Sequence, residues 1–243
     1  MSKKISLKQF LTKSGKFEKV HDCIQSIKGG EVSVNNSIIK NPNYFFNPKN
    51  ALVKLNNEKI KTVAKLYFLL NKPAGYLSQK HESEKTIYDL IGKLDLSKEQ
   101  VHSLFAVGRL DKETEGLMIL TNDGKISSLM TKPESKVEKR YQAVLEKPIT
   151  LDNIKLLEKG VIIEIDSMEY RTTKCKIKKT RENEVYISIT EGKKRQIRKM
   201  FENIENKVVY LKRVSIGGLQ LGNLREGEIK QTTKEEIMEK IFQ

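Results

Sequence analysis

The stretch VGRLDKETEGLMILTNDG, residues 107–124, joins a polar loop to a short apolar strand. The first half, Gly108 to Gly116, has a glycine at each end, and between them it offers Arg109, Asp111, Glu113 and Glu115. The second half contains LMIL, which predicts a buried strand, and ends in NDG, which predicts a turn. A charged loop held against a buried strand can direct a carboxylate at a substrate, so this stretch is the first candidate site.

Composition indicates a folded, basic protein with an anionic partner. The 243 residues include 46 Lys and Arg against 31 Asp and Glu, a net charge of +15. Residues 1–62 hold 12 lysines and 4 acidic residues, a net +8 in a quarter of the chain. An excess of this size indicates an anionic partner and makes the N-terminal quarter the better candidate for an electrostatic binding module.

Several functional classes are disfavoured by what the sequence lacks. Cys23 and Cys175 are far apart, and the three histidines are scattered, so neither a disulfide framework nor a metal site is indicated. No phosphate-binding loop of the GxxxxGK[ST] type and no GxGxxG motif occurs, so we expect no cofactor. No apolar run approaches the length of a membrane span, and we expect a cytoplasmic protein that does not bind membranes.

The N-terminal 62 residues have the pattern of a small α+β unit. Apolar residues recur at helical spacing over residues 5–11 and again over 17–27, and GG at 29–30 ends the second helix. EVSVNNSII at 31–39 predicts a tight hairpin. Two helices and a hairpin in a lysine-rich segment, with GGEVSVNN, resemble the S-four type RNA-binding domain. The resemblance implies RNA binding, although Glu18 and Lys19 stand about where that family has a Ser-Arg pair. A solvated basic face is the alternative.

Residues 63–243 have the pattern of a larger, strand-rich domain. Strands are predicted over 66–70, 141–145, 161–165, 174–178, 185–189 and 208–211, and helices over 87–91, 151–157 and 195–204. The order lacks a βαβ rhythm, so we expect an α+β fold built on a mixed, mainly antiparallel sheet flanked by helices.

Three separated segments of this second domain match one family. The opening stretch, KVEKRYQAVL at 136–145 and EGKKRQIRKMF at 191–201 resemble the pseudouridine synthases, specifically those of the RsuA type. LLNKPAGY at 69–76 and VSIGGLQLGNLREGE at 214–228 add support, and an S-four type domain in front is typical of the family. The resemblance covers nearly the whole chain.

The resemblance implies an isomerisation of uridine within RNA, which requires no cofactor and no metal. The base must leave the ribose, rotate and rejoin through carbon 5, and a carboxylate can act as nucleophile, base or charge stabiliser. By resemblance that carboxylate is Asp111. Tyr141 matches the active-site tyrosine, and Arg198 matches the basic residue that pairs with the aspartate and keeps it ionised. Without the other motifs, a packed strand tyrosine and an exposed helix arginine are the simpler readings.

Substrate contacts are expected from Arg109 and from Lys194, Arg195 and Gln196. In related enzymes an arginine at the place of Arg109 helps to fill the gap left by a flipped-out uridine. A local ion pair between Arg109 and Asp111 is its alternative, and a solvated helix face is the alternative for the basic residues around 194. Glu113 and Glu115 are expected to be structural.

The sequence therefore predicts a site-specific RNA pseudouridine synthase of two domains, an S-four type domain at 1–62 and a catalytic domain at 63–243. The expected substrate is ribosomal RNA, with the small-subunit (16S) RNA favoured by the segment at 214–228. Large-subunit RNA and transfer RNA remain alternatives, as does a non-catalytic RNA-binding or ribosome-assembly factor. The expected partner is RNA or an assembling ribosomal particle, and the protein is expected to be a monomer.

Overall fold

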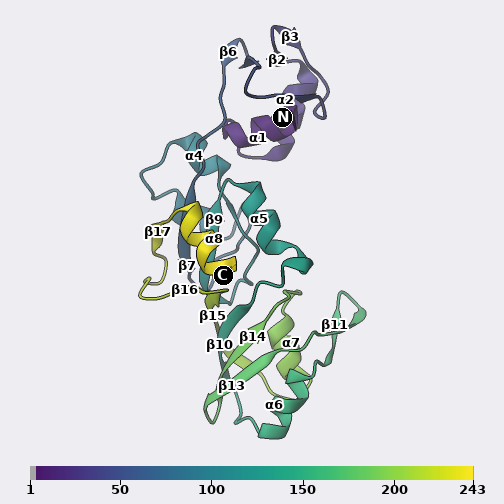
Figure 1. The fold of residues 1–243 in the computed structure, drawn as a ribbon, viewed down its shortest axis with the longest axis vertical. Helices are drawn as coiled ribbons and strands as arrows, with labels where there is room; N and C mark the ends of the chain where they lie inside the picture. The colour runs from purple at the N-terminus through teal and green to yellow at the C-terminus, as the bar shows by residue number, and fades with distance from the viewer. Residues whose placement is uncertain (1–3, 243) are drawn as a thin grey trace. The chain divides into compact units, whose positions relative to one another are not determined.

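The computed structural model describes residues 4–242, which form two compact units (Figure 1). The first unit contains the chain up to Leu66 together with residues 91–105, and the second contains residues 67–90 and the chain from Ala106 onward. The first unit therefore includes a segment that the predicted division at 62/63 places in the second domain. Among residues 4–242, no helix has the length and apolar character to cross a membrane.

The first unit is built on two capped helices. Ser6 and Gln9 form a capping box at the start of α1 (Leu7–Ser14), and Gly15 ends it in the left-handed conformation. The second helix, α2 (Val20–Gly29), ends at Gly30 in the same way. Their apolar faces enclose a core with Val32 and Val53 of the adjoining sheet. The two predicted helices and the hairpin are thus present.

The small sheet of this unit has the strand order β3-β2-β5-β6. Its strands are β2 (Val32–Val34), β3 (Ser37–Ile38), β5 (Val53–Leu55) and β6 (Glu58–Lys59), and β1 (Ile5–Ser6) pairs separately with β4 (Phe45–Phe46). Residues 91–105 join this unit through α4 (Lys98–Ser103), which lies beside α1. There Glu99 pairs with Lys16 at 2.9 Å, and the His102 ring donates to the Gly15 carbonyl at 3.2 Å.

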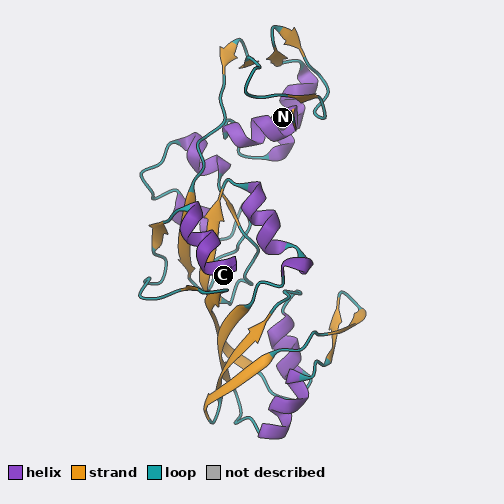
Figure 2. Cartoon of the chain, in the orientation of Figure 1, coloured by secondary structure: helices purple, strands orange, loops and turns teal. Residues whose placement is uncertain are grey.

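The second unit is built on a long twisted sheet, drawn as orange strands in Figure 2. Its main path runs β13-β14-β10-β15-β9-β7-β17, and the β15–β9 pair is parallel whereas the other pairs along this path are antiparallel. The strands are β7 (Tyr67–Lys72), β9 (Glu115–Thr121), β10 (Lys139–Leu145), β13 (Lys176–Arg181), β14 (Glu184–Ile189), β15 (Val208–Ile216) and β17 (Ile229–Gln231). The predicted α+β class with a mixed, mainly antiparallel sheet is confirmed.

The remaining helices and short strands of the chain flank or connect the strands of this sheet. They are α3 (Ile87–Ile91), β8 (Phe105–Ala106), α5 (Gly124–Thr131), the 3-10 turn η1 (Pro133–Ser135), α6 (Leu151–Glu158), the hairpin β11 (Ile162–Ile165) and β12 (Met168–Arg171), α7 (Gln196–Glu202), β16 (Leu219–Gln220) and α8 (Lys234–Phe242). One face of β7 and β9 packs against α5 and α8 through Ile119, Ile126 and Ile237, each at most 2% exposed. This buried centre makes β9 a rigid base for the loop that precedes it.

The structure differs from one local prediction and contains helices that the sequence did not predict. NDG at 122–124 does not form a free turn, because the Asp123 side chain accepts from Lys125 N and caps α5. The C-terminal helix α8 was not predicted, although Ile237 and Ile241 have the spacing of a buried helical face. Asp, Asn and Gly are common both in turns and at helix starts, so the NDG motif alone does not distinguish a turn from the start of a helix.

A close backbone contact joins the parallel strands β9 and β15. Gly116 has φ +110°, and a Cβ at this position would lie 2.2 Å from the Arg213 carbonyl oxygen. Only glycine fits such a contact in this conformation. The second glycine of the opening stretch therefore allows β9 to approach β15 directly beside the candidate site.

Candidate active site

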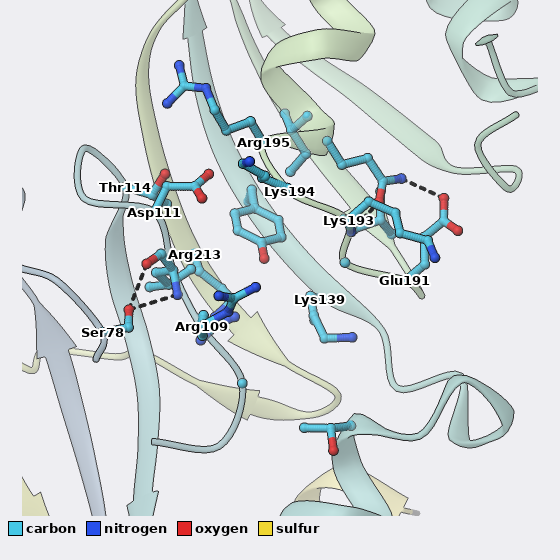
Figure 3. Close-up of a pocket in the computed structure, with 18 of the residues that line it drawn as sticks. Ser78, Arg109, Asp111, Thr114, Lys139, Glu191, Lys193, Lys194, Arg195 and Arg213 are labelled. Carbon is cyan, nitrogen blue, oxygen red and sulfur yellow. Dashed lines mark hydrogen bonds between the residues drawn. The ribbon is translucent and has the colours of Figure 1, made fainter. Parts of the chain in front are cut away.

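All seven site residues predicted from the sequence line one cavity of about 880 Å³ in the second unit. They are Arg109, Asp111, Tyr141, Lys194, Arg195, Gln196 and Arg198. They come from the 107–114 loop, β10 and the start of α7, which lie up to 89 positions apart in the chain. Figure 3 shows Asp111 on one side of this cavity and Lys193 and Lys194 on the other. The structure thus brings the predicted residues together, while their chemical roles remain predictions.

Asp111 presents an unengaged carboxylate to the cavity. Its backbone carbonyl accepts from Thr114 N at 3.0 Å, which closes a turn, and the residue is half-buried. Within residues 4–242 its side chain makes no hydrogen bond or ion pair, and no ion pair joins it to Arg109, whose side chain is exposed. The local Arg109–Asp111 pair, the alternative to base flipping, is therefore not formed.

The backbone on either side of Asp111 is held by buried side chains of the preceding strand and loop. Ser78 Oγ donates to the Leu110 carbonyl at 2.6 Å and accepts from Leu110 N at 3.0 Å. Lys72 has no exposed surface, and its Nζ donates to the carbonyls of Thr114 at 2.9 Å and Lys112 at 3.3 Å. These contacts fix the direction in which the Asp111 side chain leaves the backbone.

Sequence reasoning did not identify Ser78 or Lys72 as site residues. Lys72 lies in NKPAGY, a segment that supports the family resemblance but carries none of the predicted site residues. The available signal was a lysine that directly follows the apolar run and Asn71 in one strand, because a lysine buried there needs several acceptors for its ammonium.

Tyr141 is 7% exposed on β10, in the middle of the sheet. It lies opposite Arg213 of β15 on one side and Ile187 of β14 on the other. Its ring lines the cavity, so both the packing role and the predicted contact with a base are compatible with its position.

Arg198 reaches the Asp111 loop through the backbone rather than through the carboxylate. Its Nη1 donates to the Val208 carbonyl at 2.7 Å and its Nη2 to the Glu113 carbonyl at 3.5 Å, whereas its buried Nε has no partner among residues 4–242. Burial and the charge of Arg195 lower the pKa of Arg198, while Glu113 and Asp111 act in the opposite direction. The expected ion pair with Asp111 is absent within 4 Å because the two carbonyls hold the guanidinium.

The other predicted substrate residues are engaged with neighbouring side chains. Lys194 pairs with Asp166 at 2.9 Å, and Arg195 pairs with Glu113 at 2.9 Å. Gln196 is buried and donates to Glu191 at 2.6 Å, so its visible role is to hold the loop before α7. Of the four predicted substrate residues, Arg109 is thus the one whose side chain makes no hydrogen bond or ion pair within residues 4–242.

Glu113 and Glu115 contact groups other than Asp111. Burial would raise the pKa of Glu113, but its backbone hydrogen bond and the charges of Arg195 and Arg198 lower it overall. Glu115 accepts from the Tyr210 hydroxyl at 2.9 Å. Their placement agrees with the structural role expected from the sequence. No group of three or more potential metal ligands is present in residues 4–242.

Comparison with known proteins connects this geometry to one enzyme family. The family model described as RNA pseudouridylate synthase matches residues 66–203. The chain is 34% identical over 215 residues to an uncharacterized RNA pseudouridine synthase of Bacillus subtilis, covering 87% of this chain and 88% of that protein. It is 32% identical to ribosomal small subunit pseudouridine synthase A of Salmonella typhimurium, covering 88% and 90%. A crystal structure of a pseudouridylate synthase superposes with a TM-score of 0.69 at 28% identity, covering 97% and 99%.

Proposed function

The chain belongs to the RsuA-type RNA pseudouridine synthases and is an enzyme that acts on RNA, and from this premise we propose that it isomerises a uridine of small-subunit ribosomal RNA. The choice of RNA is supported by the similarity to small-subunit enzymes over nearly nine-tenths of the chain. Asp111 is the proposed catalytic residue.

The observation that carries the assignment of Asp111 is its unengaged carboxylate, held on a fixed backbone within a cavity. A carboxylate without a salt bridge is free to attack or to stabilise charge on the sugar as the bond between base and ribose breaks. For Tyr141, whose ring lines the same cavity from β10, the proposed role is to stack on the uracil and to move a proton through its hydroxyl. The proposed role of Arg109 is to fill the position of the extruded base, which its exposure in the loop and its place in the cavity lining support.

Release of tritium tests the proposal directly. Transcripts of 16S, 23S and transfer RNA labelled at uridine carbon 5 are incubated with the protein, and the modified position is mapped. We expect release from 16S RNA and none with Asp111→Asn, which keeps the size of the side chain but removes its charge. Release that survives Asp111→Asn contradicts the catalytic assignment. Release only from another RNA contradicts the choice of substrate, and no release from any RNA supports the non-catalytic alternative.

Arg198 provides a second test of the same site. Because it holds the carbonyls at 113 and 208, its loss should disturb the position of Asp111 without removing an exposed RNA contact. We expect Arg198→Ala to lower kcat by about a hundredfold while RNA affinity changes by no more than a few-fold. Filter binding and tritium release measure the two effects. A matching collapse of affinity would instead make Arg198 a phosphate-contact residue.

A further inference from the structure

Among the cationic side chains that line the cavity outside the predicted set, two lie on adjacent strands of the central sheet. Lys139 begins β10, and Arg213 lies on the neighbouring strand β15, directly opposite Tyr141. Both line the cavity that contains Asp111, and Figure 3 shows both below Asp111 in that view. Arg213 is 3% exposed, and Lys139 is half-buried. Neither residue belongs to the set predicted from the sequence.

Neither cation has a carboxylate partner among residues 4–242. Lys139 Nζ donates only to the Val137 carbonyl at 3.1 Å. Arg213 Nε donates to the Leu117 carbonyl at 2.7 Å, and its buried Nη2 has no hydrogen-bond partner. Buried guanidinium and ammonium groups are normally paired, so this arrangement is incomplete without a further acceptor.

The carboxylate whose charge acts on Lys139 is Glu191, and other donors already occupy it. Glu191 Oε1 accepts from Thr173 N at 2.9 Å and from Gln196 at 2.6 Å, and its Oε2 accepts from the Tyr170 hydroxyl. No ion pair within 4 Å joins Glu191 to Lys139 in the described chain. The Glu191 carboxylate thus holds the loop before α7 and does not pair with Lys139.

The proximity of the two cations has an electrostatic cost. Burial and then the charge of Arg213 lower the pKa of Lys139, against the opposing effect of Glu191. Two like charges held together in a partly buried site repel each other unless an anion is bound between them. A phosphate suits this pair, because a guanidinium offers planar donors and an ammonium offers a compact point charge.

We propose that Lys139 and Arg213 form a phosphate subsite that binds the phosphodiester of the target nucleotide, while Asp111 and Tyr141 act on its sugar and base. This inference rests on the proposed function, since an RNA substrate supplies the phosphate. The subsite would hold a uridine by its backbone while the base is released and rotates. It assigns a positioning role to Lys139 and Arg213, which lie on the same two strands, β10 and β15, that hold Tyr141 in the sheet.

The test uses uridine 3′,5′-bisphosphate and uridine as probes of the full-length protein. The Arg213 Nε–H group is bonded to a carbonyl and buried, so its ¹⁵N resonance should be protected from exchange and observable. Arg213→Lys identifies this resonance by its loss. We expect the bisphosphate to shift it and to bind at least about tenfold more tightly than uridine, the effect of one or two charge-assisted hydrogen bonds.

Variants of Lys139 separate a phosphate contact from general charge. Lys139→Met keeps the aliphatic length and should weaken bisphosphate binding by about tenfold while uridine binding is unchanged. Lys139→Arg should retain most of the binding, which also shows that position 139 tolerates substitution. Lys178→Met removes an exposed lysine of β13 that does not line the cavity, and it should have no effect.

Equal affinity of the protein for the bisphosphate and for uridine overturns the proposal. So does a loss of bisphosphate affinity in Lys178→Met that is as large as the loss in Lys139→Met. A shift caused equally by uridine would mean that Arg213 contacts the base or ribose instead of the phosphate. No step of this test requires turnover or the correct RNA. Phosphate-dependent binding without tritium release from 16S RNA would therefore retain the subsite and reject the proposed substrate.

Discussion

At the scale of single residues, Lys72 connects β7 to the loop that carries Asp111. Its ammonium is fully buried and donates to the carbonyls of Pro73 at 2.8 Å, Thr114 at 2.9 Å and Lys112 at 3.3 Å. Burial lowers the pKa of Lys72 to about 8, although Glu115, Asp111 and Glu113 favour its charged form. The position of the loop is thus maintained at an electrostatic cost.

The lowered pKa of Lys72 predicts a pH dependence of stability. Between pH of about 8 and the ordinary value of 10.5, the unfolded lysine is protonated while the folded one is largely neutral. The unfolded state then binds more protons, so the contribution of Lys72 to the free energy of unfolding should increase as pH rises through this window. Below a pH of about 8, Lys72 is charged in both states, and the full free-energy cost of burying its ammonium lowers the stability of the folded protein.

Urea unfolding of the wild type and Lys72→Met over this pH range measures that contribution as a difference. The contribution of Tyr67, whose pKa burial raises to about 12, is present in both proteins and cancels in the comparison. Lys178→Met, at an exposed site, should show no such trend. A wild-type minus Lys72→Met difference that stays flat or falls from pH of about 8 to about 10 would contradict the expectation.

At the scale of elements, the parallel pair β9–β15 determines where the site residues meet. β9 follows the Asp111 loop, and β15 carries Arg213 and pairs with β10, which carries Tyr141. Gly116 makes the close approach of β9 and β15 possible. The arrangement of the cavity therefore depends on a backbone contact as well as on side chains.

Gly116→Ala should destabilise the protein strongly. The added Cβ would lie 2.2 Å from the Arg213 carbonyl oxygen, and φ of +110° disfavours any side chain. We expect a loss of about 2–4 kcal/mol in the free energy of unfolding, measured with urea. Gly124→Ala at the start of α5 is the matched control, since its Cβ meets nothing within 4 Å, and it should be nearly neutral. Similar stability of both variants would show that the two strands can separate without cost.

At the scale of the whole molecule, the basic charge is concentrated in the first 62 residues, with a net +8, while the remaining 181 residues carry +7. The cavity lies in the second unit. We therefore expect RNA affinity and catalysis to be separable, with the N-terminal lysines contributing to affinity through phosphate contacts.

Replacing the exposed lysines at 28, 40, 49 and 59 with glutamine tests this separation. We expect weaker RNA binding and a decrease of up to about 3 in the slope of log affinity against log salt, with kcat unchanged at saturating RNA. Four exposed lysines of the second unit outside the cavity, at 155, 159, 207 and 234, serve as the control and should change the slope less. An equal effect of both sets would contradict a dedicated N-terminal binding module.

Sequence patterns were enough to predict many of the helices and strands and the candidate site residues, although they missed α4, α5 and α8. The apolar run 117–120 predicted a buried strand, helical spacing predicted α1 and α2, and the GRLD, KRY and RQIR motifs singled out Asp111, Tyr141 and Arg198. These features are local, because hydrophobic periodicity and short motifs are contained within a few neighbouring residues.

The contacts between residues far apart in the chain could be identified only in the folded structure. Arg198 contacts carbonyls at 113 and 208, Ser78 holds Leu110, and Lys139 and Arg213 lie on the adjacent strands β10 and β15 and line the same cavity. These partners lie from 10 to 85 positions apart, and no periodicity in one segment records the register or backbone approach of another. Burial then sets the protonation and the hydrogen bonds of each group, and burial follows only from the assembled sheet.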